Sequence, residues 1–428
     1  MASRVPGRDT ARAEAIGAVE AVWRIESARV VAGLARIVND VGLAEDLAQD
    51  ALVAALEQWP AQGIPRRPGA WLMAIGKNRA IDRIRRDQLL TRKQEEIGRD
   101  LQSRQFAPDD EMDAALDEDF GDDILRLMFV ACHPVLSREA RVALTLRLLG
   151  GLSTGEISRA FLSSEATVAQ RIVRAKRTLA EANVPFELPS RDDIPSRLSS
   201  VLEAIYLIFN EGYAATAGDD WIRPELCNEA LRLGRTLATL TPDEPEVHGL
   251  VALMAIQTSR LAARTDSSGN PVLLLDQDRS RWDHTLIQHG LAALDRAEAA
   301  GQAFGPYALQ AAIAACHARA RRAEETDWER IVALYDALAQ VMPSPIVELN
   351  RAVAVSMAFG PAEGLDAVEA LSAEPALQAY HLLPAVRGDL LLKLGRRDEA
   401  RTEFLRAASL AGNARERAFL EARAAESA

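Results

Sequence analysis

Apolar residues recur along the chain with the spacing of α-helices rather than the alternation of strands. Over residues 14–38, 43–58 and 69–86 they return every three or four positions, which predicts three amphipathic helices. A turn at 39–42 separates the first two, and a Pro-rich connector at 59–68 separates the last two. The apolar candidates are Val19, Val22, Trp23, Val30, Leu34, Val38, Leu43, Leu47, Ala51, Ala55, Trp71, Leu72, Ile75, Ile81 and Ile84.

A second group of shorter helices is predicted within residues 124–183. Ser137 can cap one helix, and Ser153 with Glu156 matches a capping box at the start of the next. After a tight turn, Ser164 can cap a longer helix with one apolar stripe. That stripe consists of Val168, Ile172, Ala175 and Leu179. Two helices joined by a short turn, the second longer and basic, are typical of the helix-turn-helix motif.

The remaining chain, residues 190–428, is predicted to be a stack of helix pairs. Gly388, Gly395 and Phe404 have a spacing similar to that of tetratricopeptide repeats, and Gly360 lies about one period of 34–35 residues before Gly395. The segment 264–282 interrupts the pattern, and its mixed apolar content predicts an ordered loop. We therefore expect an α-solenoid-like domain here.

Composition supports an all-α protein of several domains. The 428 residues are 48% apolar but only 5% aromatic, and 26% charged, which excludes a wholly disordered chain. Three cysteines without paired spacing indicate a reducing compartment. No signal peptide and no long apolar run is recognisable, so a cytoplasmic protein without membrane contact is expected.

Charge is unevenly distributed along the chain, whose net charge is −12. Residues 191–428 carry 34 acids against 24 bases, whereas residues 1–190 are nearly balanced. Bases gather at 71–86 and 167–180, and nine acids without a base fill 107–123. Two basic patches joined by an acidic linker favour two modules that face nucleic acid. The alternative is that both are solvated helix faces.

One cluster in the second half is a candidate for an enzymatic or metal site. It combines His284 and His289 with Asp276, Asp278 and Asp283. The spacing puts the two histidines on different faces of a helix, unlike the i, i+4 pair that binds zinc. We therefore expect no catalytic activity, no metal and no cofactor.

The order of these features resembles that of extracytoplasmic-function (ECF) sigma factors of the sigma-70 family. GLAEDLAQDALVAALEQWP followed by GAWLMAIGKNRAIDRIRR resembles their region 2, and the segment from Leu136 to Leu179 resembles their region 4. The remainder resembles the long C-terminal extension of one subgroup. Its marks here are FNEGYAAT (209–216), DQDRSRWD (276–283), GPYALQAAIAACHA (305–318) and ELNRAVAV (348–355).

This resemblance implies a domain plan and three sets of binding residues. Region 2 would occupy 14–90, an acidic linker 91–123, region 4 124–183, and a tetratricopeptide-like regulatory domain 190–428. Residues implied to contact core RNA polymerase are Glu45, Asp46, Leu47, Gln49 and Asp50. Those implied at the −10 element are Lys77, Asn78, Arg79, Arg83 and Arg86. Those implied at the −35 element are Ser164, Thr167, Gln170, Arg171, Arg174 and Lys176.

The implied partners are the β′ clamp and β flap of core RNA polymerase, double-stranded promoter DNA, and the opened −10 strand. Two departures stand out: the loop PAQGIPRRPG between the region 2 helices, and the acid Glu165 at the start of the recognition helix, which repels phosphate unless it accepts from cytosine. The acidic extension is expected to modulate activity, with a signalling protein or ligand as its partner, in a bacterial, nucleoid-associated protein.

Two other functions are compatible with the same motifs. One is a helix-turn-helix regulator that binds an operator without polymerase and carries a protein-interaction solenoid. The other is an adaptor scaffold, in which both basic patches are incidental. The acidic stripe at 45–50 and the upstream basic helix favour the sigma factor, because a simple operator-binding regulator needs neither.

Overall fold

The structure is a computed structural model that describes residues 8–95, 120–161, 163–190, 192–214, 221–301 and 303–427. These residues form helices and connecting turns without a β-strand; the one isolated bridge pairs Thr265 with Pro271. The chain divides into two compact units, between Ala204 and Ile205. The all-α prediction is confirmed, whereas most of the predicted acidic linker lies outside the described residues.

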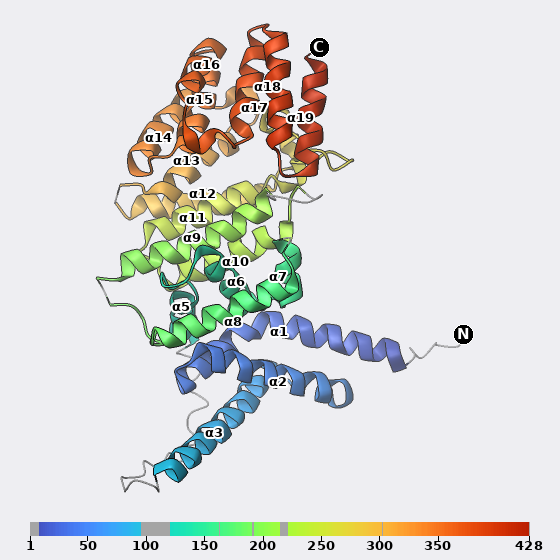
Figure 1. Ribbon diagram of the computed structural model, residues 1–428, viewed down its shortest axis with the longest axis vertical. Coiled ribbons are helices and arrows are strands. Elements are labelled where there is room, and N and C mark those ends of the chain that lie inside the picture. Colours follow the sequence, from blue (N-terminus) through green and yellow to red (C-terminus); the bar gives the residue numbers. More distant parts are fainter. Residues whose placement is uncertain are drawn as a thin grey trace. The chain divides into compact units, whose positions relative to one another are not determined.

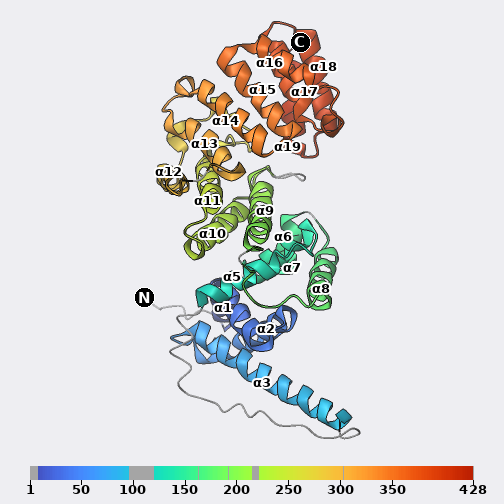
Figure 2. The same ribbon diagram turned by 90° about the vertical axis from the view of Figure 1, so that its left-hand side faces the viewer.

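The first unit contains two groups of helices. The first group comprises α1 (Arg8–Val38), α2 (Val41–Gln62) and α3 (Pro68–Glu95). The second comprises α5 (Phe120–Ala131), α6 (Arg138–Leu148), α7 (Thr154–Ala160) and α8 (Glu165–Glu181), and the start of α9 (Ile194–Tyr213) follows. Figure 2 shows α3 continuing well past α1 and α2.

The three helices of the first group pack through small and aliphatic side chains. Leu34 and Leu72 are almost fully buried, and a Cβ at Gly76 would lie 2.7 Å from Leu34 Cδ1. Glycine at 76 therefore lets α3 approach α1 closely.

Three predicted boundaries in this group were wrong. The first helix begins at Arg8 rather than at 14. The second helix runs through Pro60 to Gln62 instead of ending at 58, because buried Trp59 makes an edge-on contact with Trp71, with ring centroids 5.3 Å apart. The third helix runs to Glu95 rather than 86.

The second unit is a succession of helices in which each packs against its neighbours in sequence (Figure 1). They are α10 (Pro224–Leu240), α11 (Pro245–Thr258), α12 (His284–Ala299), α13 (Pro306–Arg319), α14 (Trp328–Val341), α15 (Pro345–Phe359), α16 (Pro361–Ala370), α17 (Leu382–Lys393), α18 (Arg397–Leu410) and α19 (Ala414–Glu426). The predicted helical character of this half is confirmed. The loop at 264–282 contains short 3₁₀ turns at 274–276 and 279–281, and another 3₁₀ turn at 261–263 precedes it.

The repeat-like spacing has a structural basis in α17 and α18. A Cβ at Gly388 would lie 3.1 Å from the ring of buried Phe404, so a glycine lets that ring lie against α17. Gly360 and Gly395 both have positive φ, 123° and 77°, in the turns that lead into α16 and α18. Both glycines thus adopt a positive φ in a short turn between two helices, a conformation that favours glycine.

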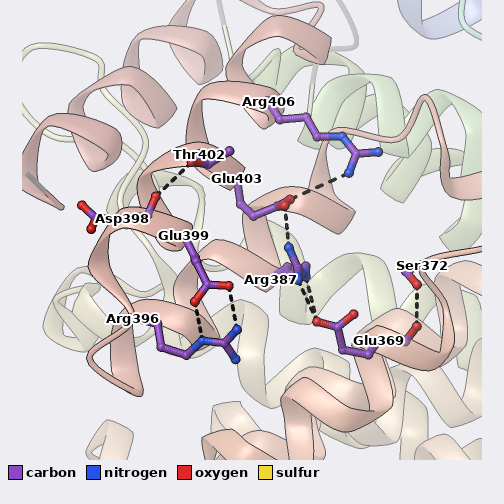
Figure 3. Close-up of polar contacts among 9 residues, drawn as sticks. All are labelled: Glu369, Ser372, Arg387, Arg396, Asp398, Glu399, Thr402, Glu403 and Arg406. Carbon is purple, nitrogen blue, oxygen red and sulfur yellow. Dashed lines mark hydrogen bonds and ion pairs between the residues drawn. The ribbon is translucent and has the colours of Figure 1, made fainter.

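An ion-pair network ties α16, α17 and α18 together (Figure 3). Arg387 donates to Glu369 at 2.8–3.0 Å and to Glu403 at 2.6 Å, so one guanidinium bridges two neighbouring helices. Arg396 pairs with Glu399 one turn later in α18. Half-buried Arg387 and exposed Arg396 thus both have carboxylate partners.

In the described part of the chain, none of the helices is both long enough and apolar enough to cross a membrane.

Candidate nucleic-acid interface

The helix-turn-helix forms from α7 and α8, and its caps are those that the sequence predicts. The Ser153 amide donates to Glu156 Oε2 at 2.8 Å, and the Glu156 amide donates to Ser153 Oγ at 3.2 Å. Ser164 Oγ accepts from the Thr167 amide at 3.1 Å and starts α8. Each cap satisfies amides that have no partner within the helix. The start of the second helix is thereby fixed in position.

The two faces of α8 separate as predicted. Val168, Ile172, Ala175 and Leu179 are buried, each at most 5% exposed. On the opposite face, the predicted −35 residues Ser164, Thr167, Gln170 and Arg174 are exposed and Arg171 is half-buried. Arg174 donates to Gln170 Oε1 at 3.2 Å. This face offers hydroxyl, amide and guanidinium groups, the types that hydrogen-bond to base edges and phosphates.

Glu165 has a structural partner beside this face. Its Oε1 accepts from the Thr154 hydroxyl at 3.0 Å, which joins the first residue of α8 to the first residue of α7. This contact gives the acid a role within the motif that does not require a cytosine.

The predicted −10 residues lie along α3. Asn78, Arg83 and Arg86 are exposed, and Lys77 is half-buried. Arg79 Nη1 lies 3.1 Å from Asp50 Oδ2 on α2, and both side chains stay partly exposed. Arg79, predicted to bind the −10 element, is therefore paired with Asp50, predicted to contact polymerase.

The predicted outward acidic stripe on α2 is partly wrong. Asp46 and Asp50 are exposed, but Glu45 is only 5% exposed, and Gln49 is half-buried and donates to Glu45. Leu47, an apolar residue predicted to face the core, is buried as expected. The apolar pattern of α2 does not reveal this burial, because side chains from two other helices, α6 and α8, cover this edge of α2.

Glu45 is the centre of that contact. Its Oε1 accepts from Arg147 of α6 at 2.9 Å, and its Oε2 accepts from Lys176 of α8. Lys176 Nζ also lies 3.2 Å from Asp46 Oδ1. A cation predicted to bind DNA is thus held by two acids predicted to bind polymerase. Its stem passes over α2 at Gly42, where a Cβ would lie 3.5 Å from Lys176 Cδ.

Further polar contacts join the two groups of helices in the first unit. Arg24 of α1 pairs with Glu156, and Arg36 of α1 lies 3.4 Å from Asp123 of α5. Asn39 Oδ1 accepts from the Phe186 amide at 3.3 Å. The sequence analysis missed these residues and Arg147, because single polar residues at helix edges leave no periodic signal.

The start of α9 packs on the second group. Arg197 donates to the Phe129 carbonyl at 2.9 Å, and Ser200 donates to the Cys132 carbonyl at 2.7 Å. Glu203 lies within 3.0 Å of both Arg138 and Arg141. The first residues after the helix-turn-helix therefore support the helices that carry it.

Two of the cysteines are protonated thiols in the core, and the two histidines of the candidate cluster lie on the surface. Burial raises the pKa of the Cys132 thiol to about 11 and that of Cys227 to about 12, so both remain neutral. His284 and His289 are both exposed. Among the described residues, no group of three His, Cys, Asp or Glu could hold a metal ion.

Comparison with protein families gives three matches along the chain. Residues 24–89 match the model of sigma-70 region 2, and residues 126–179 match that of sigma-70 region 4. Residues 197–298 match a family of unknown function, DUF6596.

Two relatives extend this picture. An uncharacterized protein, R00370, from Rhizobium meliloti (strain 1021) is 47% identical over 393 residues, which cover 92% of each chain. The ECF RNA polymerase sigma factor SigK of Mycobacterium ulcerans (strain Agy99) is 28% identical over 155 residues, 35% of this chain and 78% of that protein. No solved structure matches.

The contact at Glu45 leads to a prediction about stability. In a double-mutant cycle of Glu45→Gln and Lys176→Met, we expect a coupling free energy of about 0.5–3 kcal/mol in denaturant unfolding of the full chain. The reason is that each single change leaves a partner charge in a place where it is largely removed from water.

The matched control is Arg177 with Glu181, an exposed pair on α8 at 3.3 Å. Exposed pairs of this spacing couple by only about 0.3–0.5 kcal/mol. A coupling at Glu45 no larger than that of the control would show that the two groups of helices are not held by this carboxylate.

Proposed function

The chain belongs to the sigma-70 family as an ECF-like sigma factor with a C-terminal extension, and from this premise we propose how its residues act. It binds core RNA polymerase through α2, directs it to promoters through α3 and α8, and is modulated by the helical extension. The observation that carries this proposal is that a capped recognition helix with a polar, basic face shares one unit with the acidic α2 and the basic α3.

At the −35 element, we propose that α8 enters the major groove with its N-terminus first. Ser164, Thr167 and Gln170 lie in its first two turns, where they can reach base edges. Arg171 reads a guanine, and Arg174 and Lys176, nearer the C-terminus, contact phosphates. The exposure of this face in the described structure supports the assignment.

At the −10 element, α3 supplies a row of cations to the opened strand. Arg79, Arg83 and Arg86 follow one another at helical spacing, and Lys77 and Asn78 come directly before them. Extruding a base costs a few kcal/mol in lost stacking, and phosphate contacts from this row offset part of that cost.

At the polymerase, Asp46 and Asp50 are the exposed acids of residues 45–50, with exposed side-chain fractions of 73% and 59%. We propose that they contact the β′ clamp after they separate from Lys176 and Arg79. Glu45 and Leu47 are buried, so their proposed role is indirect. Both stabilise α2 in the fold, and Glu45 also binds Arg147 and Lys176. The β flap is the proposed contact of the region 4 part.

The Lys176 contact adds a constraint to this proposal. Lys176 cannot bind a phosphate at full strength while it pairs with Glu45 and Asp46, and Asp46 is less available to polymerase in the same state. We infer that binding of polymerase and promoter favours a state in which this contact is broken. The free energy of binding must then include the cost of separating these charges.

The polymerase assignment predicts that Asp46→Arg combined with Asp50→Arg abolishes co-purification with core RNA polymerase, because two exposed acids become cations. The matched control is Glu57→Arg, an exposed acid on the same helix outside the proposed surface. Normal association of the double variant, with an unchanged melting temperature, would contradict the assignment.

The −35 assignment predicts that Arg171→Ala weakens promoter binding by about 1–3 kcal/mol and relaxes the preference at one base pair. Arg177→Ala, near the C-terminus of α8, should weaken binding equally for all sequences, because a phosphate contact carries no base information. Binding selection from randomised DNA with the holoenzyme measures both. Unchanged discrimination by Arg171→Ala would show that the docking is wrong.

The role of the extension can be tested with two fragments. A chain ending at 186 loses the contacts of Arg197, Ser200 and Glu203 with the helices that carry the motif, whereas a chain ending at 213 retains them. We expect the shorter fragment to melt at a lower temperature.

We also expect the longer fragment to transcribe less than the full chain, if residues after 213 support activity. More transcription from it would mean that the extension inhibits. Transcription equal to that of the full chain would contradict any modulation by the extension.

A further inference from the structure

The second unit contains a cavity that the proposed contacts with DNA and polymerase do not use. Its volume is about 310 Å³, and its lining comes from α9, α11, α13, α14 and α15 and from Leu274 in the loop. Ligand sites for small molecules start at about this size and are typically clefts with a few placed polar groups. Asn210 and Asn350, both exposed, belong to the lining, so the cavity is open to solvent.

The segments that mark the extension in the sequence converge on this cavity. FNEGYAAT contributes Phe209, Asn210 and Tyr213, and ELNRAVAV contributes Asn350. GPYALQAAIAACHA contributes Gln310, Ile313, Ala314 and His317. DQDRSRWD lies next to it, since Arg279 donates to the His317 carbonyl at 2.6 Å and the Trp282 ring lies 5.8 Å from the Arg260 guanidinium.

The aromatic and amide groups of the lining are already held in place. Tyr206 donates to Gln310 Oε1 at 3.0 Å, and Tyr213 donates to Gln257 Oε1 at 3.0 Å. Phe209 stacks on Tyr213 with ring centroids 5.6 Å apart. Such fixed aromatic faces suit a flat apolar group, because neither partner loses much freedom on binding.

The described residues of the lining include a positive charge but no negative charge. Arg260 is the only charged residue in the lining, is 8% exposed, and donates to Tyr213 and Gln257. Its Nε has no hydrogen-bond partner, and the described residues offer it no carboxylate. Arg264, beside it and also buried, likewise lacks an ion pair in the described structure and donates to the Tyr213 carbonyl. A buried cation without a counter-ion is costly.

Arg387, in the same unit, differs from Arg260 in its ion-pair partners. That guanidinium is less buried, yet it has two carboxylate partners (Figure 3). Among the described residues, Arg260 thus differs from Arg387 in having no carboxylate partner.

A second polar group of the lining is also unpartnered. His317 is 9% exposed, and its Nδ1 has no hydrogen-bond partner. Burial and the nearby Arg260 and Arg279 lower its pKa to about 4, so the imidazole is neutral at pH 7. A neutral imidazole can donate or accept one hydrogen bond to a ligand.

We propose that this cavity binds a small organic monocarboxylate with an aromatic body. The carboxylate lies against Arg260 and His317, and the ring lies among the tyrosines and Phe209. One guanidinium in the lining matches one negative charge, whereas a phosphate monoester brings nearly two. The site is independent of the proposed sigma activity, because none of its residues belongs to the proposed polymerase or DNA contacts.

The test measures binding to the purified full chain without polymerase, so its outcome does not depend on transcription. The probes are benzoate, phenylacetate and indole-3-acetate, each paired with its neutral amide, and inorganic phosphate. Saturation-transfer NMR and titration calorimetry detect binding at millimolar concentration. We expect at least one carboxylate to bind, and its amide to bind at least about tenfold more weakly.

Two variants locate the site. Ala314→Leu fills the cavity from α13 without changing charge, and we expect it to weaken binding of that carboxylate at least about tenfold. Ala333→Leu, at an exposed alanine of α14, is the matched control and should bind normally. Melting curves check that both variants fold, and Gln310→Leu replaces Ala314→Leu if that variant does not.

Three results would overturn the proposal. They are binding of no carboxylate probe, equal binding of a carboxylate and its amide, and unchanged binding after the cavity is filled. Binding of phosphate in place of the carboxylates would also overturn it.

Discussion

Glu45 is a carboxylate removed almost completely from water, and the arrangement of the N-terminal unit depends on how its charge is balanced. A buried charge destabilises a fold unless an opposite charge and hydrogen bonds meet it. Here Arg147 and Lys176 arrive from two helices of the region 4 part to meet an acid of the region 2 part. The two parts of the sigma factor therefore have a defined contact in this state, with a charge at its centre.

This contact couples the binding surfaces. Lys176 belongs to the helix proposed for the −35 element, and Asp46, which it also touches, belongs to the surface proposed for polymerase. A similar pair joins Arg79 of α3 to Asp50 of α2. Binding of promoter DNA to Lys176 or Arg79 thus releases an acid of the proposed polymerase surface. Binding of polymerase to Asp46 or Asp50 likewise releases a cation of the proposed DNA surface. This linkage gives the protein a physical means to favour promoter binding together with polymerase binding.

Much of the local structure could be predicted from the sequence, because it depends on neighbours in the chain. The capping box at Ser153 and Glu156, the cap at Ser164, and the apolar stripe of α8 all lie where their spacing indicates. The burial of Glu45 could not be predicted in this way, since helical periodicity identifies a polar face but not the helix that later covers it.

The cavity of the second unit escaped prediction for the same reason. Its lining comes from five helices spread over more than a hundred residues, and the charge of Arg260 matters because the described part of the lining contains no acid. The second helix likewise runs past Pro60 because Trp59 meets Trp71 from the following helix. Tertiary contacts decided each of these outcomes.

The most direct test of the central claim is transcription in vitro by core RNA polymerase from a library of randomised promoters, with and without the full chain. The account predicts that transcripts form only when the chain is present, and that their templates share two elements at −35 and −10. Absence of transcripts, together with selection of a DNA site by the chain alone, would contradict it and indicate an operator-binding regulator.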